Sequence, residues 1–187
     1  MFIHCYNEAI RYTYVYNALI IFFLYFTSIN ISSNDKNYFK SDLAVFRALE
    51  AFISGQITQT ITHLKRSHDW LGTCDTKINK FQEAYKLLLT KLTSQTPHPP
   101  TVQGPKACFH FGDSHCLSYA YHSLKLDGIT HTIVPKLIIG AKAFHFSNQN
   151  NNRYKTLLEI NFQSIPKNSK VLLSFGEIGF LHPLHMK

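Results

Sequence analysis

Three short apolar runs in the second half of the chain each end at a glycine. The runs cover residues 107–111, 131–139 and 170–175, and they are followed by Gly112, Gly140 and Gly176. Helical patterns over residues 115–124 and 154–162 separate them. Strand-length apolar runs that alternate with helices predict an α/β fold around a largely parallel sheet. Because sites in such sheets form at the carboxyl ends of strands, the residues beside the three glycines are candidate site residues.

A proline-rich segment, residues 96–105, precedes this region. Prolines at this density exclude a helix or a central strand, so the segment is expected to be a linker. We therefore expect one α/β domain over residues 106–187 and a separate region before the linker.

Residues 41–95 have a helical pattern. Ser41 or Asp42 can cap a first helix, and apolar residues then recur at steps of three and four. Gly55 interrupts this pattern, and further helices are expected over residues 57–64 and 78–92. The region is interpreted as a helical hairpin region that serves as a cap or a docking element.

An apolar run, residues 15–29, lies inside the N-terminal segment 1–40. The run is shorter than the roughly twenty residues of a membrane-spanning helix. Its length fits the hydrophobic part of a signal peptide, although no A-x-A-like cleavage site follows. Three interpretations stay open: a signal or anchor that contacts a membrane, a buried helix, or a non-native upstream extension of the reading frame. The expected localisation is accordingly cytoplasmic or membrane-associated.

The formal net charge of +8 would favour contact with nucleic acid or anionic lipid. The positive residues are scattered, however, and no basic block is longer than Lys65-Arg66. A nucleic-acid module would show a basic stripe, so no nucleic-acid partner is expected.

Cysteine and histidine spacing predicts no metal site. The four cysteines have no C-x-x-C spacing, which argues against a zinc knuckle or a redox pair. Cys108 and Cys116 are expected to be small buried apolar residues. His182 and His185 are three residues apart but have no acidic or cysteine partner nearby. We expect neither a metal nor a cofactor.

The turn Gly112-Asp113-Ser114 directly follows the first apolar run. The helical pattern starts at His115, so Ser114 stands where a strand ends and a helix begins. Nucleophilic hydrolysis needs an exposed hydroxyl beside backbone donors that can receive a developing oxyanion. Ser114 is therefore the candidate nucleophile, whereas the simpler role for Asp113 is to shape the turn.

The three glycine blocks, in this order on an α/β pattern, resemble the SGNH/GDSL hydrolase superfamily over residues 106 to about 178. The resemblance implies a partial three-layer α/β/α sheet of the SGNH or flavodoxin-like kind. It also implies that Ser114 is the catalytic nucleophile and that the oxyanion hole includes Ser114, Gly140 and Gly176. The family's third block adds an asparagine side chain, but Ile178 occupies that position here and cannot donate. The implied activity is that of an esterase or acyltransferase on a small-molecule or glycan ester.

The family's Asp-x-x-His block has no counterpart in this sequence. The chain stops eleven residues after Gly176 and offers only His182-Pro183-Leu184-His185. We therefore expect an incomplete hydrolase domain, which arises from a fragment or from an altered reading frame.

Without that block, the base for Ser114 would have to be local. His115 is adjacent, but neighbours at a helix start point in different directions, which argues against it. His145 lies in the loop after Gly140 and is the better local candidate, although a solvated loop histidine is the simpler interpretation. Glu177 could hydrogen-bond the serine or a substrate hydroxyl, or it could cap the next segment.

Two functions from different classes follow. The first is an SGNH-like esterase or acyltransferase that acts through Ser114. The second is a non-catalytic truncated α/β domain that serves as a binding or interaction module with its helical hairpin. The Gly-Asp-Ser motif favours the first, and the missing Asp-x-x-His favours the second.

Overall fold

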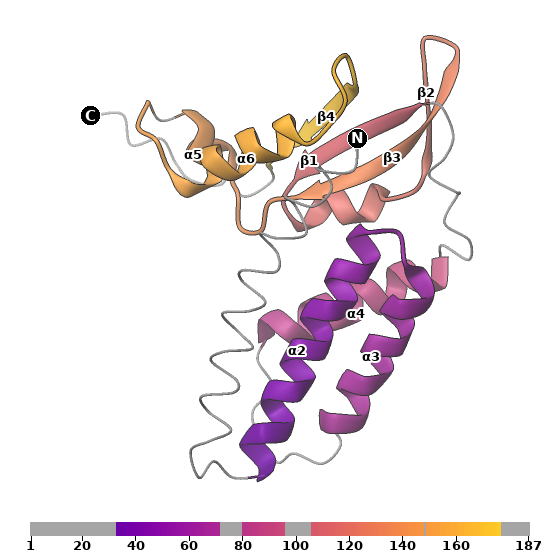
Figure 1. Cartoon of the computed structure of the whole chain (residues 1–187), viewed down its shortest axis with the longest axis vertical. Coiled ribbons are helices and arrows are strands. Elements are labelled where there is room, and N and C mark those ends of the chain that lie inside the picture. The colour runs from indigo at the N-terminus through magenta and orange to yellow at the C-terminus, as the bar shows by residue number, and fades with distance from the viewer. Residues whose placement is uncertain (1–32, 72–79, 96–105, 148, 177–187) are drawn as a thin grey trace. The chain divides into compact units, whose positions relative to one another are not determined.

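The computed structural model describes residues 33–71, 80–95, 106–147 and 149–176 (Figure 1). The chain divides into two compact units, Met1–Pro97 and His98–Lys187. The apolar run 15–29 and the whole of the expected linker lie outside the described residues, so their assignments, and the finer division of the chain, stay predictions. Among the helices that are described, none is long and apolar enough to cross a membrane.

The first unit contains the helices α2 (Ser33–Ile53), α3 (Ile57–Leu71) and α4 (Lys80–Gln95) (Figure 1). The predicted break at Gly55 is confirmed, since this residue has a φ of 76°. The N–H of Gly55 donates to the carbonyl of Phe52, and that of Gln56 donates to the carbonyl of Ala51. This pair of bonds is a Schellman motif, which needs a left-handed residue and so favours glycine.

The predicted start of the first helix was wrong. Helix α2 already begins at Ser33, and Ser41 lies in its interior with only 1% of its surface exposed. The Ser41 hydroxyl lies 2.9 Å from the Ser67 hydroxyl and 3.1 Å from the Ser67 carbonyl oxygen of α3. A serine that can hydrogen-bond to a neighbouring helix needs no capping role to be satisfied.

A polar group interrupts the apolar packing of the three helices. Asp42 is half-buried, and its Oδ1 has no hydrogen-bond partner within the described chain. Burial raises the pKa of Asp42 to about 6, against a smaller opposing effect of a hydrogen bond with the side chain of Gln82. The unit therefore holds a carboxyl group that is costly to ionise.

The second unit is built on a mixed four-stranded sheet with the strand order β2-β3-β1-β4. Strands β3 (Ile129–Leu137) and β4 (Lys170–Ser174) run parallel to the central strand β1 (Ala107–Gly112) on either side. Strand β2 (Ser123–Leu126) is antiparallel to β3. With the helix α6 (Arg153–Gln163), this confirms the α/β class and the positions of the three predicted strands.

The helix predicted over residues 115–124 is replaced by two other elements. A 3-10 helix, η1 (Ser114–Tyr119), follows β1 directly and is succeeded by β2. Leu117 and Ala120 are buried as the predicted inner face required. The Asp127-Gly128 pair, with φ values of 51° and 78°, then joins β2 to β3. Two consecutive positive φ angles are what a two-residue hairpin of type I′ requires.

The two faces of β1 contact different elements. Cys108 and His110 point to one face, where the His110 ring lies 5.7 Å from the ring of Tyr119 in η1. Phe111 points to the other face and stacks at 4.5 Å on Phe162 of α6. Helix α6 has no buried residue, so it covers its face of the sheet only loosely.

Candidate active site

The carboxyl ends of the three parallel strands meet at one edge of the sheet. Gly112 at the end of β1 pairs with Leu137 of β3 on one side and with Ser174 of β4 on the other. The N–H of Ile138 donates to the Gly112 carbonyl, and the N–H of Ala143 donates to the Phe175 carbonyl. The loop after β3 therefore reaches the end of β4.

This edge brings together the segments that hold the predicted site residues. Ser114 is the first residue of η1, Gly140 lies in the loop after β3, and Gly176 lies just past β4. His145 lies in the short helix α5 (Ala143–Ser147) of the same loop. The predicted supporting residue Glu177 lies outside the described residues.

Gly112 is required by a close approach of three elements. A Cβ atom at this position would lie 2.6 Å from the Ser174 carbonyl oxygen, 2.7 Å from the Ser174 hydroxyl and 2.9 Å from the Cβ of Cys116. Contacts this short cannot be relieved by a side-chain rotation alone, because one of them is with backbone. The glycine thus lets the end of β4 and the start of η1 pack directly on β1.

Asp113 and His115 form a pair on either side of Ser114. Oδ1 of Asp113 accepts the backbone N–H of His115 at 2.9 Å and lies 2.8 Å from Nδ1 of its ring. The side chain of Asp113 is 13% exposed and that of His115 is 53% exposed. Asp113 was predicted to shape the turn, and its side chain caps η1 through the first bond. The second bond was not predicted, because it depends on the side-chain conformation of His115.

A second histidine contact lies beneath this turn. Nε2 of His110 is 2.7 Å from the hydroxyl of Ser174, and the His110 residue is only 1% exposed. Its Nδ1 has no hydrogen-bond partner within the described chain. Burial lowers the pKa of His110, and the negative charge of Asp113 opposes that effect. Neither His110 nor Ser174 was chosen as a site residue from the sequence. The pattern His110-x-Gly112 does place the His110 ring on the face where Gly112 meets β4.

Aromatic and cationic side chains surround Gly140, which has a φ of 74°. The Tyr154 hydroxyl lies 3.6 Å from the position of a Cβ on Gly140, and Nη2 of Arg153 donates to that hydroxyl at 2.7 Å. The ring of His145 stacks on that of Tyr154 at 3.9 Å. Partial burial and then the charges of Lys142 and Arg153 lower the pKa of His145. The sequence marked His145 but gave no sign of this stacking.

The protonation of His145 is set by one hydrogen bond. Its Nδ1 accepts the backbone N–H of Lys142 at 3.0 Å. A backbone N–H can only donate, so the neutral ring carries its proton on Nε2. His145 in this arrangement has no nitrogen that could take a proton from Ser114.

The described cysteines are unsuited to nucleophilic chemistry. Cys108 and Cys116 are free thiols and both are buried, as expected from the sequence. Burial, and then the nearby charge of Asp113, raises the pKa of Cys116 to about 12. A thiol held in its neutral form is a poor nucleophile, so Ser114 stays the candidate nucleophile at the end of β1.

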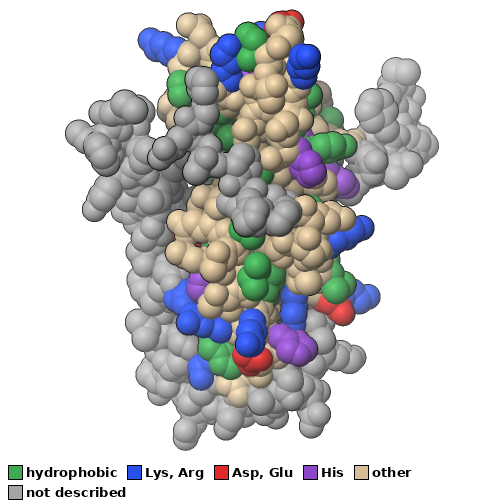
Figure 2. Space-filling model, turned by 90° about the vertical axis from the view of Figure 1, so that its right-hand side faces the viewer, with side chains coloured by type: hydrophobic (Ala, Val, Ile, Leu, Met, Phe, Trp, Pro, Cys, Tyr) green, Lys and Arg blue, Asp and Glu red, His purple; other side chains and the backbone are tan. Residues whose placement is uncertain are grey.

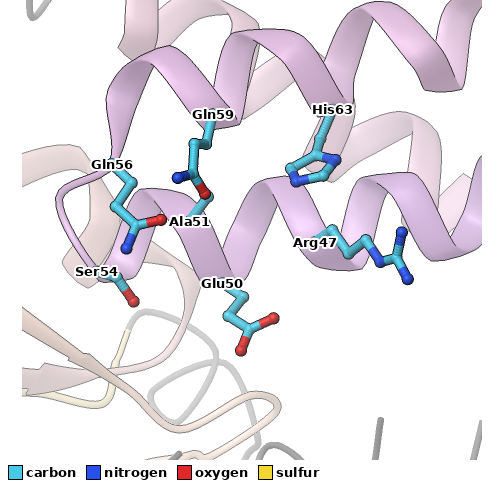
Figure 3. A pocket seen from close by; sticks show the side chains of 7 residues that line it. All are labelled: Arg47, Glu50, Ala51, Ser54, Gln56, Gln59 and His63. Atoms are coloured by element: carbon cyan, nitrogen blue, oxygen red, sulfur yellow. The ribbon is translucent and has the colours of Figure 1, made fainter.

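A hollow in the first unit is a separate candidate for ligand binding (Figure 3). It lies between α2 and α3 and has a volume of about 380 Å³. It is lined by Arg47, Glu50, Ala51, Ser54, Gln56, Gln59 and His63. Burial, and then the charges of Arg47 and Arg66, lower the pKa of His63. The hollow offers polar and charged groups but no serine–histidine hydrogen bond.

The basic side chains on the drawn surface are dispersed (Figure 2). On the face drawn in Figure 2, the coloured Lys and Arg side chains are interspersed with apolar, acidic and histidine side chains. They form no continuous stripe there among the residues described. In the same parts of the chain, no three His, Cys, Asp or Glu side chains gather to hold a metal ion.

Comparison with known proteins gives no family assignment. The resemblance to SGNH/GDSL hydrolases therefore rests on the motif residues of this chain alone. No protein-family model, no curated protein and no solved structure matches the chain.

Proposed function

We propose that the second unit is an SGNH/GDSL-like serine hydrolase, an esterase or acyltransferase whose substrate is a small-molecule or glycan ester. The observation that carries the proposal is the position of Ser114. It is half-buried, begins η1 directly after the central parallel strand, and stands between the paired side chains of Asp113 and His115. A serine in such a strand-to-helix turn can present its hydroxyl at the edge of the sheet.

The order of the parallel strands supports a three-layer, flavodoxin-like arrangement of the domain. Along the chain the parallel strands are β1, β3 and β4, and across the sheet they lie as β3-β1-β4. This is the second-first-third order with which a doubly wound sheet begins. Such sheets bind ligands where the order reverses, and here that point lies between the ends of β1 and β4. The contact between His110 and Ser174 bridges those two ends.

The proposed chemistry is acyl transfer through the serine. The Ser114 hydroxyl attacks the acyl carbonyl carbon, and the backbone N–H groups of Ser114 and Gly140 receive the oxyanion, with Gly176 as a further candidate. Loss of one such donor typically lowers kcat by roughly a hundred- to a thousandfold. The alcohol then leaves, and water or an acceptor hydroxyl releases the acyl group from the serine.

The proposal is tested by ester hydrolysis with two serine variants of the full chain. Wild-type protein is expected to hydrolyse p-nitrophenyl acetate above the buffer rate, and Ser114→Ala to abolish this activity. Ser118→Ala, which changes an exposed serine of the same 3-10 helix, is the matched control and should keep it. A fluorophosphonate probe should label the wild type at Ser114, as located by peptide mass spectrometry. Equal hydrolysis by wild type and Ser114→Ala would refute the proposed nucleophile.

A non-catalytic interaction module is the second candidate function, and one observation favours it. Val171, Leu172 and Leu173 of β4 are 37%, 40% and 55% exposed. Among the described strands β4 pairs only with β1, so its other edge is open to a partner. Under this alternative, wild type and Ser114→Ala would show the same background hydrolysis.

A further inference from the structure

We infer that His115, oriented by Asp113, is the general base and acid for Ser114. This inference rests on the proposed esterase function and names the proton acceptor that the sequence left open. Asp113 and His115 would together take the role that the Asp-x-x-His block performs in SGNH/GDSL hydrolases, a block that has no counterpart in this sequence.

The hydrogen bond within the pair determines which ring nitrogen can accept a proton. An ionised carboxylate only accepts hydrogen bonds, so Nδ1 of His115 must be the donor in its 2.8 Å contact with Oδ1 of Asp113. The neutral ring then carries its lone pair on Nε2, on the side of the ring away from the carboxylate. This is the orienting role that the aspartate of a serine-hydrolase triad performs.

The other histidines at this edge are arranged differently. The neutral form of His145 is protonated on Nε2, as the Lys142 N–H requires. Nε2 of His110 is occupied by the Ser174 hydroxyl, and the ring is buried on a face of the sheet. Of these three, His115 alone combines a carboxylate on Nδ1 with a largely exposed side chain.

Adjacency in sequence is compatible with this role because the proton can pass through a water molecule. A general base acts within hydrogen-bond reach of the proton, either directly or through one water. The 53% exposure of the His115 side chain admits that water. We therefore place one water between Nε2 and the Ser114 hydroxyl in the reacting complex.

Ser114, His115 and the bridging water account for every proton that is transferred in the reaction. As the Ser114 oxygen bonds to the acyl carbon, its proton passes through the water to Nε2 of His115. The carbon–oxygen bond to the alcohol then breaks, and the alcohol takes the proton back from the imidazolium. In the second half, Nε2 accepts a proton from the attacking water, and Ser114 recovers it when the carboxylic acid is released.

Alanine substitution with chemical rescue tests the inference. His115→Ala should lower kcat for p-nitrophenyl acetate by roughly a hundredfold or more, the usual contribution of a general base. Imidazole added at millimolar concentration should restore part of the rate, because the vacated position is open to solvent. His122→Ala, which changes an exposed histidine of the neighbouring segment, should retain the wild-type rate.

A second variant separates catalysis from folding. His115→Gln keeps an amide that can donate to Asp113 but has no group that accepts a proton, so it should be folded and inactive.

The outcomes distinguish the inference from the proposed function. If Ser114→Ala is inactive but His115→Gln hydrolyses like the wild type, the inference is overturned and the serine hydrolase stands. If folded His115→Ala is inactive and imidazole restores nothing, the role of His115 is structural and the inference also fails. If wild type and Ser114→Ala hydrolyse alike, the proposed function itself fails.

Discussion

Replacing Asp42 by asparagine should stabilise the helical unit at neutral pH. The carboxyl group of Asp42 is half-buried in α2, and its Oδ1 has no hydrogen-bond partner within the described chain. Burial raises its pKa from 3.8 to about 6, so ionisation at pH 7 opposes folding. Asparagine has nearly the same shape and cannot ionise, so it removes this penalty.

The magnitude follows from the pKa of Asp42. A rise from 3.8 to about 6 corresponds to a ceiling of about 3 kcal/mol in the free energy of unfolding. Because much of the side chain still reaches solvent, screening reduces the expected gain to about 1–2 kcal/mol.

The sign of the pH dependence is set by proton binding to the folded state. The folded pKa of Asp42 lies above the unfolded value, so between pH 3.8 and about 6 the folded protein binds more protons. The stabilising contribution of Asp42 is therefore fully present below pH 3.8 and is lost as the pH rises through about 6. Asp42→Asn should match the wild type near pH 4 and exceed it at pH 7.

Tryptophan fluorescence during urea unfolding measures this difference. Trp70 is the only tryptophan in the chain and lies in α3, so its emission reports on the helical unit. Asp69→Asn changes an exposed carboxylate of the same helix and should shift stability by only a few tenths of a kcal/mol at either pH. The reasoning is refuted if Asp42→Asn has the same unfolding midpoint as the wild type at pH 7, or a lower one.

Three further predictions concern the second unit. Gly112→Ala should destabilise the sheet by about 1–3 kcal/mol through overpacking. Gly176→Ala, whose Cβ would meet no atom of the described residues within 4 Å, should change stability by less than about 0.5 kcal/mol, and amide hydrogen exchange of β1 compares the two variants. Ser174→Ala should cost about 1–3 kcal/mol, because it leaves both ring nitrogens of buried His110 unpaired, and faster exchange in β4 would reveal this. Leu173→Lys, on the open edge of β4, should lower light scattering at high protein concentration without a change in melting temperature; unchanged scattering would contradict an adhesive edge.

The sequence predicted the strands of the sheet better than the segment between β1 and β3. Strands β1 and β4 are short apolar runs that are each followed by a glycine, so their positions can be predicted from the local sequence. Residues 115–124 carry apolar residues at helical spacing, but the structure divides them between the 3-10 helix η1 and strand β2. The Asp127-Gly128 pair was recognised as a turn, yet its use as a tight hairpin depends on the pairing of β2 with β3.

The candidate site was predictable only in part for a similar reason. The position of Ser114 after β1 follows from neighbouring residues, whereas the ring of His115 lies against Asp113 only through its side-chain conformation. The contact of His110 with Ser174 depends on the register of β1 against β4, which no local pattern specifies. The start of α2 at Ser33 was missed because the Ser41 hydroxyl bonds to another helix rather than to its own N-terminus.

The placement of β1 at the centre of the sheet has a consequence for synthesis on the ribosome. β1 is the first of the described strands to be made, yet Cys108 must pair with Ile133 of β3 on one side and Lys170 of β4 on the other. Translation must therefore pass residue 170 before both edges of β1 can be covered. Until then the nascent chain exposes an apolar strand with an unpaired edge, which is the kind of surface that chaperones bind. Slow decoding between β3 and β4 would lengthen that exposure, so the yield of folded protein should depend on codon choice in this interval.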